Sequence, residues 1–290
     1  MATNRSLTRN VTFYNPTHPD VALGGLVQNG SITEANFLDI LGILLLTGAS
    51  PIRVQERMSS HILSRIETPL QTGVYHIYCD AAIQVSDEPW TPRLIAPEVT
   101  GRDSSFLNIV WNRDRKCVIS RISIPETSIR SNNWTTFEAT HIFPPEHEPL
   151  WIQNNYGRWM VHKDDATESS KIGLPQNGFL LRSHLRQLFD AYLISINPDD
   201  GYKVIVLDLD IDGYDGRILD PACRNPADPY RVSDQLLRWH FRQSILANVR
   251  GAGEPIFEHD FPPGTDIVGE IHAGPYTQER FKLEIAARLK

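Results

Sequence analysis

Cysteines and long apolar runs are both scarce in this chain of 290 residues. Its three cysteines, Cys79, Cys117 and Cys223, are widely separated and show no paired spacing, which indicates buried or free thiols in a reducing compartment. No stretch approaches the roughly 18 consecutive apolar residues that a membrane span requires. The first residues also lack the apolar segment of a secretion signal. We therefore expect a soluble protein of the cytosol or nucleus, without a membrane partner.

Positively charged residues are also few in comparison with negatively charged ones. The chain has 28 Lys and Arg against 35 Asp and Glu, a formal net charge of −7 and a pI of about 5.8. Nucleic-acid-binding proteins usually present a basic excess to the phosphate backbone. A nucleic-acid partner is therefore possible through a local basic face but disfavoured by the net charge. The hydrophobic content of 41% is ordinary for a globular protein, and the sequence leaves the oligomeric state open.

The first hundred residues predict an N-terminal α+β domain, 1–100. Short strands are expected at 11–14, 24–27, 73–78 and 82–85, with a helix that starts near Ser31 or Thr33, because either residue can cap it. Ser50 and Pro51 predict the start of a second helix. On this second helix Val54, Met58, Ile62 and Ile66 recur every four residues, a spacing typical of a buried stripe.

Two further regions follow a loop rich in proline. Residues 101–205 are expected to hold a small ββα module, with strands at 117–120 and 141–143 and a helix over 180–192. Residues 206–290 are expected to pack on this module as a hairpin, a long helix from about Ser233 to Arg250, and a surface strap rich in Pro and Gly at 255–275. The fold class is thus α+β, with an N-terminal α/β layer, a ββα module and a C-terminal helical extension.

Three short motifs carry the residues that suggest chemistry. Glu138-Ala-Thr-His141 is followed by Asn177-Gly178 and then by Arg186-Gln-Leu-Phe189-Asp190. A histidine of this kind can act as a general base, and an amide can orient it. Residues 186 and 190 share a helix face because they are four positions apart.

The order and spacing of these motifs resemble the His-Asn-His (HNH) endonuclease family, in particular fungal HNH-domain proteins. Strings at 113–120, 197–203, 238–243, 250–255 and 260–266 are similar to that group, and those at 9–14 and 23–26 are more loosely similar. The resemblance implies a ββα-metal fold, with His141 as general base, Asn177 as its orienting residue and Asp190 as a ligand of Mg²⁺, Mn²⁺ or Zn²⁺. The last His of the family motif is Arg186 in this chain.

That exchange argues against a metal site. Arginine stays protonated and has only donors, so beside a divalent ion it adds repulsion where a ligand was needed. The position before His141, often a ligand in related nucleases, is Thr140, a weak ligand at best. No metal and no other cofactor is therefore expected. If a metal binds, its ligands are Asp190, Glu138 and His141; rescue by His184 needs an irregular backbone, because a helix turns about 200° between positions 184 and 186.

Three functions remain open. The favoured hypothesis is an enzyme that no longer uses a metal and carries out an isomerisation, cyclisation or dehydration of a small organic substrate in fungal specialised metabolism. Its catalytic residues are His141, Asn177, Arg186 and Asp190, with Arg186 stabilising an oxyanion. The first alternative is a metal-dependent endonuclease, and the second is an inactive binding protein. Pairing of Arg186 with Asp190 would exclude phosphate chemistry at this site.

Substrate-binding residues are the least determined part of the prediction. The insertions of the module contain several aromatic residues, for which a small ββα unit has little core of its own. Trp151, Trp159 and His184 are therefore candidates for the wall of a substrate pocket. Packing of these tryptophans against the other domain is the alternative.

Overall fold

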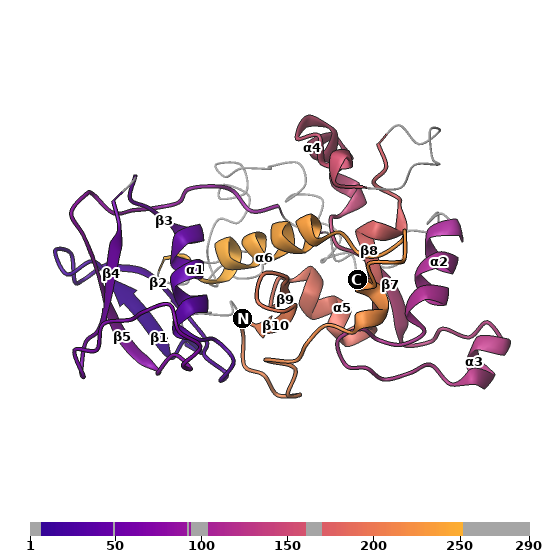
Figure 1. Ribbon diagram of the computed structural model, residues 1–290, viewed down its shortest axis with the longest axis horizontal. Helices are drawn as coiled ribbons and strands as arrows, with labels where there is room; N and C mark the ends of the chain where they lie inside the picture. Colours follow the sequence, from indigo (N-terminus) through magenta and orange to yellow (C-terminus); the bar gives the residue numbers. More distant parts are fainter. Residues whose placement is uncertain (1–6, 49, 92, 94–103, 161–169, 252–290) are drawn as a thin grey trace, which may run out of the picture.

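The structure contains two hydrophobic cores that share one long helix (Figure 1). It is a computed structural model and describes residues 7–48, 50–91, 93, 104–160 and 170–251. The expected surface strap at 255–275 lies outside these residues. No helix in the described part of the chain is long and apolar enough to cross a membrane.

The N-terminal core is built on a four-stranded sheet with the strand order β2-β1-β5-β4. Strands β1 and β5 are parallel, and the other two pairs are antiparallel. One helix, α1, packs on the inner face through Phe37, whose ring contacts Phe13 of β1 and Tyr75 of β5. The elements of this half are β1 (Val11–Tyr14), β2 (Ala22–Leu26), α1 (Glu34–Leu44), β3 (Leu45–Leu46), β4 (Ile52–Glu56), β5 (Gly73–Cys79) and β6 (Gln84–Val85).

The start of α1 follows from its sequence. Thr33 caps the helix by accepting a hydrogen bond from the Asn36 backbone N–H at 3.2 Å, while the Asn36 side chain accepts from the Thr33 N–H at 3.1 Å. This reciprocal arrangement satisfies two N–H groups that the first turn of a helix leaves without partners. Of the two predicted caps, Thr33 is the correct one.

The helix predicted to start at Ser50 and Pro51 is wrong. Residues 52–56 form strand β4, which pairs with β5, and the chain then runs irregularly to residue 72. Of the expected apolar stripe only Val54 is buried, whereas Met58 is 89% exposed and Ile62 and Ile66 are also exposed. Pairing with a distant strand outweighed the local four-residue spacing.

The second core surrounds a ββα unit made by β7, β8 and α5. Antiparallel β7 and β8 pair from Phe137 with Arg182 to His141 with Gly178, and α5 follows β8 directly. This half consists of α2 (Ser104–Asp114), α3 (Glu126–Arg130), β7 (Phe137–His141), η1 (Pro145–His147), α4 (Glu148–Gln153), η2 (Tyr156–Trp159), η3 (Pro175–Asn177), β8 (Gly178–Arg182), α5 (Ser183–Asp190), β9 (Ile194–Asn197), β10 (Lys203–Val206) and η4 (Pro221–Arg224).

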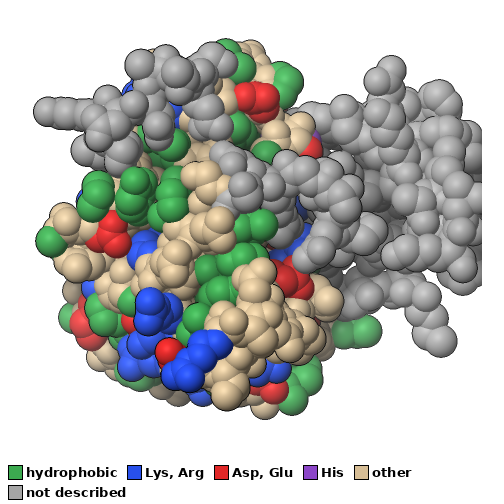
Figure 2. Space-filling view, turned by 90° about the vertical axis from the view of Figure 1, so that its right-hand side faces the viewer, with side chains coloured by type: hydrophobic (Ala, Val, Ile, Leu, Met, Phe, Trp, Pro, Cys, Tyr) green, Lys and Arg blue, Asp and Glu red, His purple; other side chains and the backbone are tan. Residues whose placement is uncertain are grey.

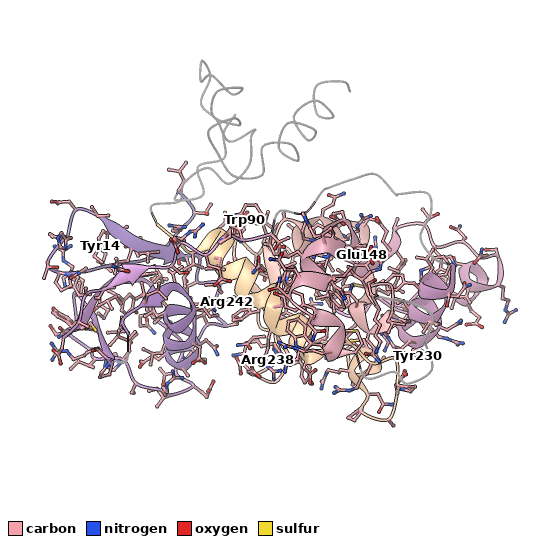
Figure 3. All side chains as sticks on the ribbon, turned by 90° about the horizontal axis from the view of Figure 1, so that it is seen from above. Tyr14, Trp90, Glu148, Tyr230, Arg238 and Arg242 are labelled. Atoms are coloured by element: carbon pink, nitrogen blue, oxygen red, sulfur yellow. The ribbon has the colours of Figure 1, made fainter. Side chains whose placement is uncertain are left out.

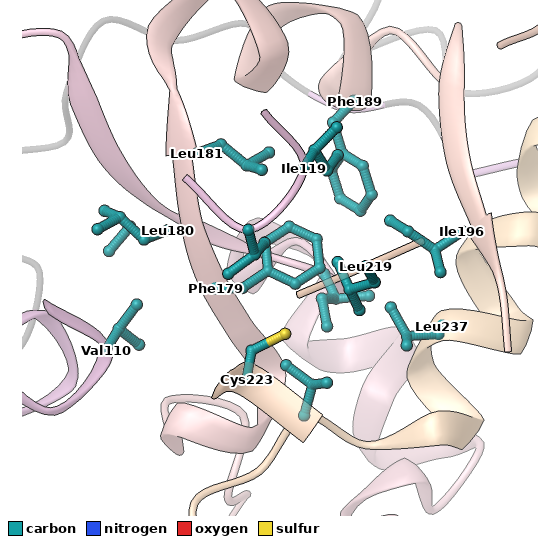
Figure 4. Packing of buried hydrophobic residues seen from close by; sticks show 14 of the residues in the cluster. Val110, Ile119, Phe179, Leu180, Leu181, Phe189, Ile196, Leu219, Cys223 and Leu237 are labelled. Carbon is teal, nitrogen blue, oxygen red and sulfur yellow. The ribbon is translucent and has the colours of Figure 1, made fainter. Parts of the chain in front are cut away.

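The ββα unit is therefore present, but its strands are not the predicted ones. Residues 117–120 form a tight turn that the Arg121 N–H closes onto the Cys117 carbonyl at 2.8 Å. The true partner of the His141 strand is β8, whose residues 180–182 were assigned to the helix. Both faces of β8 are covered, so Leu180 and Leu181 are both fully buried (Figure 4). A short apolar run of this kind cannot be distinguished from a buried helix by its periodicity.

Helix α6 (Asp234–Asn248) connects the two cores. Leu236, Leu237 and Trp239 of its first half belong to the core of the ββα unit. Phe241 and Ile245 of its second half belong to the core under the N-terminal sheet. Figure 1 shows α6 running between the two halves of the molecule. The predicted long helix is confirmed, and it packs on both halves.

Candidate functional site

The antiparallel strand pair β7–β8, called the hairpin below, presents different residues to the helices on its two faces. Successive side chains of a strand point to opposite faces, so Glu138 and Thr140 share one face while His141 lies on the other. The Glu138 face turns to α5, because the ring of Phe179, opposite Thr140 in β8, packs edge to face on Phe189 at 5.2 Å. The His141 face turns to α2, which determines what each group can contact.

On the α5 face, Arg186 lies between two carboxylates. Its Nε donates to Asp190 Oδ2 at 3.1 Å, and one terminal nitrogen, Nη1, forms a short ion pair with Glu138 Oε2. The Arg186 side chain is 15% exposed. Burial by itself lowers the pKa of this guanidinium, but the hydrogen bonds and charges of Glu138 and Asp190 outweigh burial and raise the pKa above its usual value. Arg186 is therefore a permanent cation in the position where a metal was considered.

Part of the Arg186 guanidinium has no acceptor among the described residues. Arginine has five N–H donors, and the described residues accept from its Nε and Nη1 only. The second terminal nitrogen, Nη2, has no acceptor among the described residues. Two carboxylates thus hold the side chain in one orientation while further donors stay available.

Asp190 also binds a second arginine, Arg93. The Arg93 Nη2 lies 2.8 Å from Asp190 Oδ1 and donates to the His141 carbonyl at 2.6 Å, and its Nη1 donates to the Ile142 carbonyl at 2.6 Å. Arg93 is 5% exposed, and its guanidinium lies over the ring of Phe189 at 5.4 Å. A chain of alternating charge therefore runs from Glu138 through Arg186 and Asp190 to Arg93.

Asn177 is the last residue of η3, directly before β8, and is fully buried. Its side-chain oxygen accepts from the Phe143 N–H at 2.7 Å, and its amide nitrogen donates to the carbonyls of Phe143 and Ile172 at 3.0 and 2.9 Å. The Asn177 carbonyl also accepts from the Ile142 N–H at 2.9 Å. Asn177 thus fixes the backbone that follows His141, since both N–H groups of its amide bind carbonyl oxygens.

The His141 imidazole stacks on Phe106 of α2, with ring centroids 4.0 Å apart and planes 7° from parallel. The close approach depends on Gly178, which pairs with His141. A Cβ at Gly178 would lie 2.5 Å from the Phe106 ring and 2.8 Å from the Thr140 carbonyl oxygen. The stack therefore requires glycine at this position. His141 is partly exposed at the end of β7.

The three predicted substrate-binding residues lie in two places in the structure. Trp151 is 1% exposed, donates to the Ser170 carbonyl at 2.6 Å and packs against Phe143 at 5.2 Å, so it belongs to the core. Trp159 is partly buried and stacks on Tyr156 at 4.3 Å. His184 lies within hydrogen-bonding distance of the Tyr214 hydroxyl, 3.0 Å away. Trp151 and Trp159 thus share one aromatic cluster, because both pack on Tyr156, at 6.0 and 4.3 Å, whereas His184 lies beside Tyr214.

Comparison with known families divides the chain into two matched segments. Residues 117–197 match the family model described as HNH endonuclease. These residues form an HNH-type module. Residues 8–84 match a model described as a domain of unknown function, DUF8573. No curated protein and no solved structure matches the chain. The α+β fold with an HNH-type module confirms the predicted fold class.

HNH domains typically use divalent metal ions, and the described residues around Asp190 do not suit one. Both carboxylates on the α5 face bind Arg186, whose fixed positive charge would repel a cation. His141, the third conditional ligand, stacks on the opposite face of the hairpin. In the described part of the chain no three His, Cys, Asp or Glu side chains converge on one point.

Acidic side chains accompany basic ones at two places on the described surface. Arg238 and Arg242 of α6 form ion pairs with Asp199 and Glu88. On the face at the α2 and α3 end of the molecule, Lys and Arg side chains occur together with Asp and Glu (Figure 2). The arginines of α6 are thus paired with carboxylates, and the face in Figure 2 carries side chains of both signs.

Arg93 is the site residue that sequence reasoning missed. It lies outside both matched segments and 48 positions before His141, whose carbonyl it binds. It follows Pro92 in a loop rich in proline, which was interpreted as a domain boundary. No local pattern marks an arginine that is buried only through contacts with distant residues.

Proposed function

We propose that this protein is a metal-independent acid/base enzyme, built on an HNH module and acting on a small organic substrate. The observation that supports this is the position of Arg186 between Glu138 and Asp190. The guanidinium supplies a fixed positive charge where a metal would otherwise be needed. Its unused donors suit an oxyanion that forms during an isomerisation, cyclisation or dehydration.

The residues of the site have separate roles in the proposed reaction. His141 transfers the proton, Arg186 binds the developing oxyanion, and Asp190 and Glu138 hold Arg186 in place. Asn177 fixes the backbone behind His141. The His141 imidazole and the Arg186 guanidinium lie on opposite faces of the β7–β8 strand pair. A substrate that uses both groups must therefore reach both faces. An origin in fungal specialised metabolism stays a prediction.

A metal-dependent endonuclease is the second candidate, and the match of residues 117–197 to the HNH endonuclease family favours it. This function needs a cation near Asp190, and therefore needs Arg186 to leave both carboxylates. The ion pairs of Arg186 are the reason that we rank the nuclease second.

Nicking of supercoiled plasmid distinguishes the two candidates. We expect no nicking by the unmodified protein with Mg²⁺, Mn²⁺ or Zn²⁺, and metal-dependent nicking by Arg186→His that the added change His141→Ala abolishes. Nicking by the unmodified protein that His141→Ala abolishes would refute the proposal and support the nuclease.

The oxyanion role has a separate test. Acetate, oxalate or phosphate at millimolar concentration should raise the melting temperature of the unmodified protein, because a ligand that binds only the folded state stabilises it. Arg186→Gln should remove this increase, whereas Arg238→Gln, at an exposed ion pair, should keep it. An equal increase in the unmodified protein and in Arg186→Gln would contradict a role of Arg186 in binding the anion.

A further inference from the structure

The backbone that follows His141 is held from two sides. Asn177 accepts from the N–H groups of Ile142 and Phe143 and donates to the Phe143 carbonyl. The remaining two carbonyls, those of His141 and Ile142, both accept from Arg93 at 2.6 Å. Asn177 and Arg93 together therefore satisfy the polar groups of this short segment, and neither residue can replace the other.

The segment that carries Arg93 is itself fixed. The Thr91 carbonyl accepts from the Tyr192 hydroxyl at 2.7 Å, and the Thr91 N–H donates to the Gln243 side chain at 2.7 Å. Trp90 packs edge to face on Tyr192 at 5.9 Å, and Figure 3 shows Trp90 beside α6 near the middle of the molecule. Contacts with the end of α5 and with α6 therefore determine where the Arg93 guanidinium lies.

Tyr192, which holds Thr91 in the segment before Arg93, has an unfavourable backbone conformation. It follows α5 with a φ of 61°, the left-handed region that costs a non-glycine residue about 1 kcal/mol or more. Glycine would avoid this strain at the end of a helix. The buried Tyr192 ring, however, packs on His240 at 5.0 Å and supplies the hydroxyl that binds Thr91. These contacts explain why the residue is tyrosine.

We propose that Arg93 is a positioning residue for His141. It joins the carbonyl end of β7 to Asp190 at the end of α5, so that the His141 peptide stays in the orientation that stacks the imidazole on Phe106. An arginine suits this task because its planar fork serves two carbonyls and a carboxylate at once, which a lysine ammonium cannot do in the same geometry. The catalytic meaning of this role rests on the proposed function, but the positioning itself does not.

NMR of the histidine ring protons tests the proposal without requiring turnover. The Phe106 ring should shift the His141 ring protons upfield, and a His141→Gln variant identifies these signals. In Arg93→Met they should move toward the position of a free histidine. The matched control Arg238→Met removes an arginine from an exposed ion pair with Asp199 and should leave them unchanged. A folded Arg93→Met protein with unmoved His141 signals would overturn the proposal.

If Arg93→Met does not fold, the variant Arg93→Lys still tests the positioning role of Arg93. It retains the charge opposite Asp190 but not the fork to both carbonyls. Amide hydrogen exchange at Ile142 and Phe143 should then become faster by about tenfold, as expected for losing one or two hydrogen bonds. Exchange at Tyr75 and Ile77 of β5 should not change. Equal rates at Ile142 and Phe143 in Arg93→Lys and the unmodified protein would refute the positioning role, whatever reaction the protein catalyses.

Discussion

Two arginines of this protein that are partly buried, Arg113 and Arg186, differ in how many of their guanidinium N–H groups have acceptors among the described residues. Arg113 binds both oxygens of Asp114 and three backbone carbonyls, so all five N–H donors have acceptors and the side chain is 3% exposed. Within the described part of the chain, Arg186 donates through two nitrogens, to Glu138 and Asp190, and its side chain is 15% exposed. Arg113 thus uses its whole guanidinium to stabilise the fold, whereas Arg186 has donors without an acceptor among the described residues, as its proposed role in binding an oxyanion requires.

The location of the two arginines agrees with this difference. Arg113 links α2 to Gly178 of β8 on the face where the hairpin is closely packed, and the Asp114 carboxylate also accepts from the Leu180 N–H at 2.8 Å. Arg186 lies on the face toward α5, next to Asp190 and Arg93. The following predictions test this contrast, from the largest expected effect to the smallest.

Removing Arg113 should produce the largest loss of stability. In Arg113→Met the Asp114 carboxylate stays buried without its cation, which typically costs about 3–5 kcal/mol in free energy of unfolding. Urea unfolding followed by circular dichroism measures this loss. Arg238→Met, at an exposed pair, should cost no more than about 1 kcal/mol. Equal losses in the two variants would contradict the structural role of Arg113.

Gly178→Ala tests the close packing on the α2 face. The new Cβ would contact the Phe106 ring and the Thr140 carbonyl oxygen at distances that require a shift. Overpacking of this kind typically costs about 1–3 kcal/mol. As a control, Gly42→Ala, in the exposed part of α1 with no atom near the new Cβ, should stabilise the protein by roughly 0.5–1 kcal/mol. A neutral Gly178→Ala would show that the stack of His141 on Phe106 tolerates displacement.

The buried His240 of α6 should make the free energy of unfolding depend on pH. Burial, followed by the charge of Arg93, holds the pKa of His240 well below its usual value of about 6.5. The unfolded chain therefore takes up this proton first as the pH falls. The free energy of unfolding should be independent of His240 above pH of about 6.5 and should fall below it, by up to about 1.4 kcal/mol per pH unit.

The tautomer of His240 supports this prediction. Nε2 lies 3.1 Å from the Phe189 carbonyl, to which it donates, and Nδ1 lies 2.8 Å from the Ser195 hydroxyl, which donates to it. A neutral imidazole satisfies both contacts. Denaturant unfolding of the unmodified protein and of His240→Gln between pH 5 and 8 gives the difference, with these limits chosen to bracket the usual pKa of about 6.5. A constant difference across this range would exclude the predicted shift.

The sequence predicted those parts of the fold that local chemistry determines. The Thr33 cap and the long C-terminal helix after Ser233 follow from capping and apolar spacing, and both occur where expected. The helix predicted after Ser50 and the strand at 117–120 failed, because pairing of β4 with β5 and of β7 with β8 joins residues that are distant in the chain. Such pairings leave no local signal.

The candidate site was partly predictable for the same reason. The four-residue spacing of Arg186 and Asp190 predicted that they share a helix face and left open whether a cation or an ion pair joins them; in the structure they form an ion pair. The alternation of side chains along β7 was not foreseen, and it separates His141 from Glu138. Arg93 could not be predicted, since its three acceptors come from β7, the residue after it, and α5.

Titration of Mn²⁺ by isothermal calorimetry tests the central claim, that Arg186 takes the place of a cation. The account predicts no saturable binding to the unmodified protein. It predicts binding at one site in Arg186→His, which disappears when Asp190→Asn is added. Saturable binding of Mn²⁺ to the unmodified protein, removed by Asp190→Asn alone, would contradict the account, because Arg186 would then have to release Asp190 to a metal.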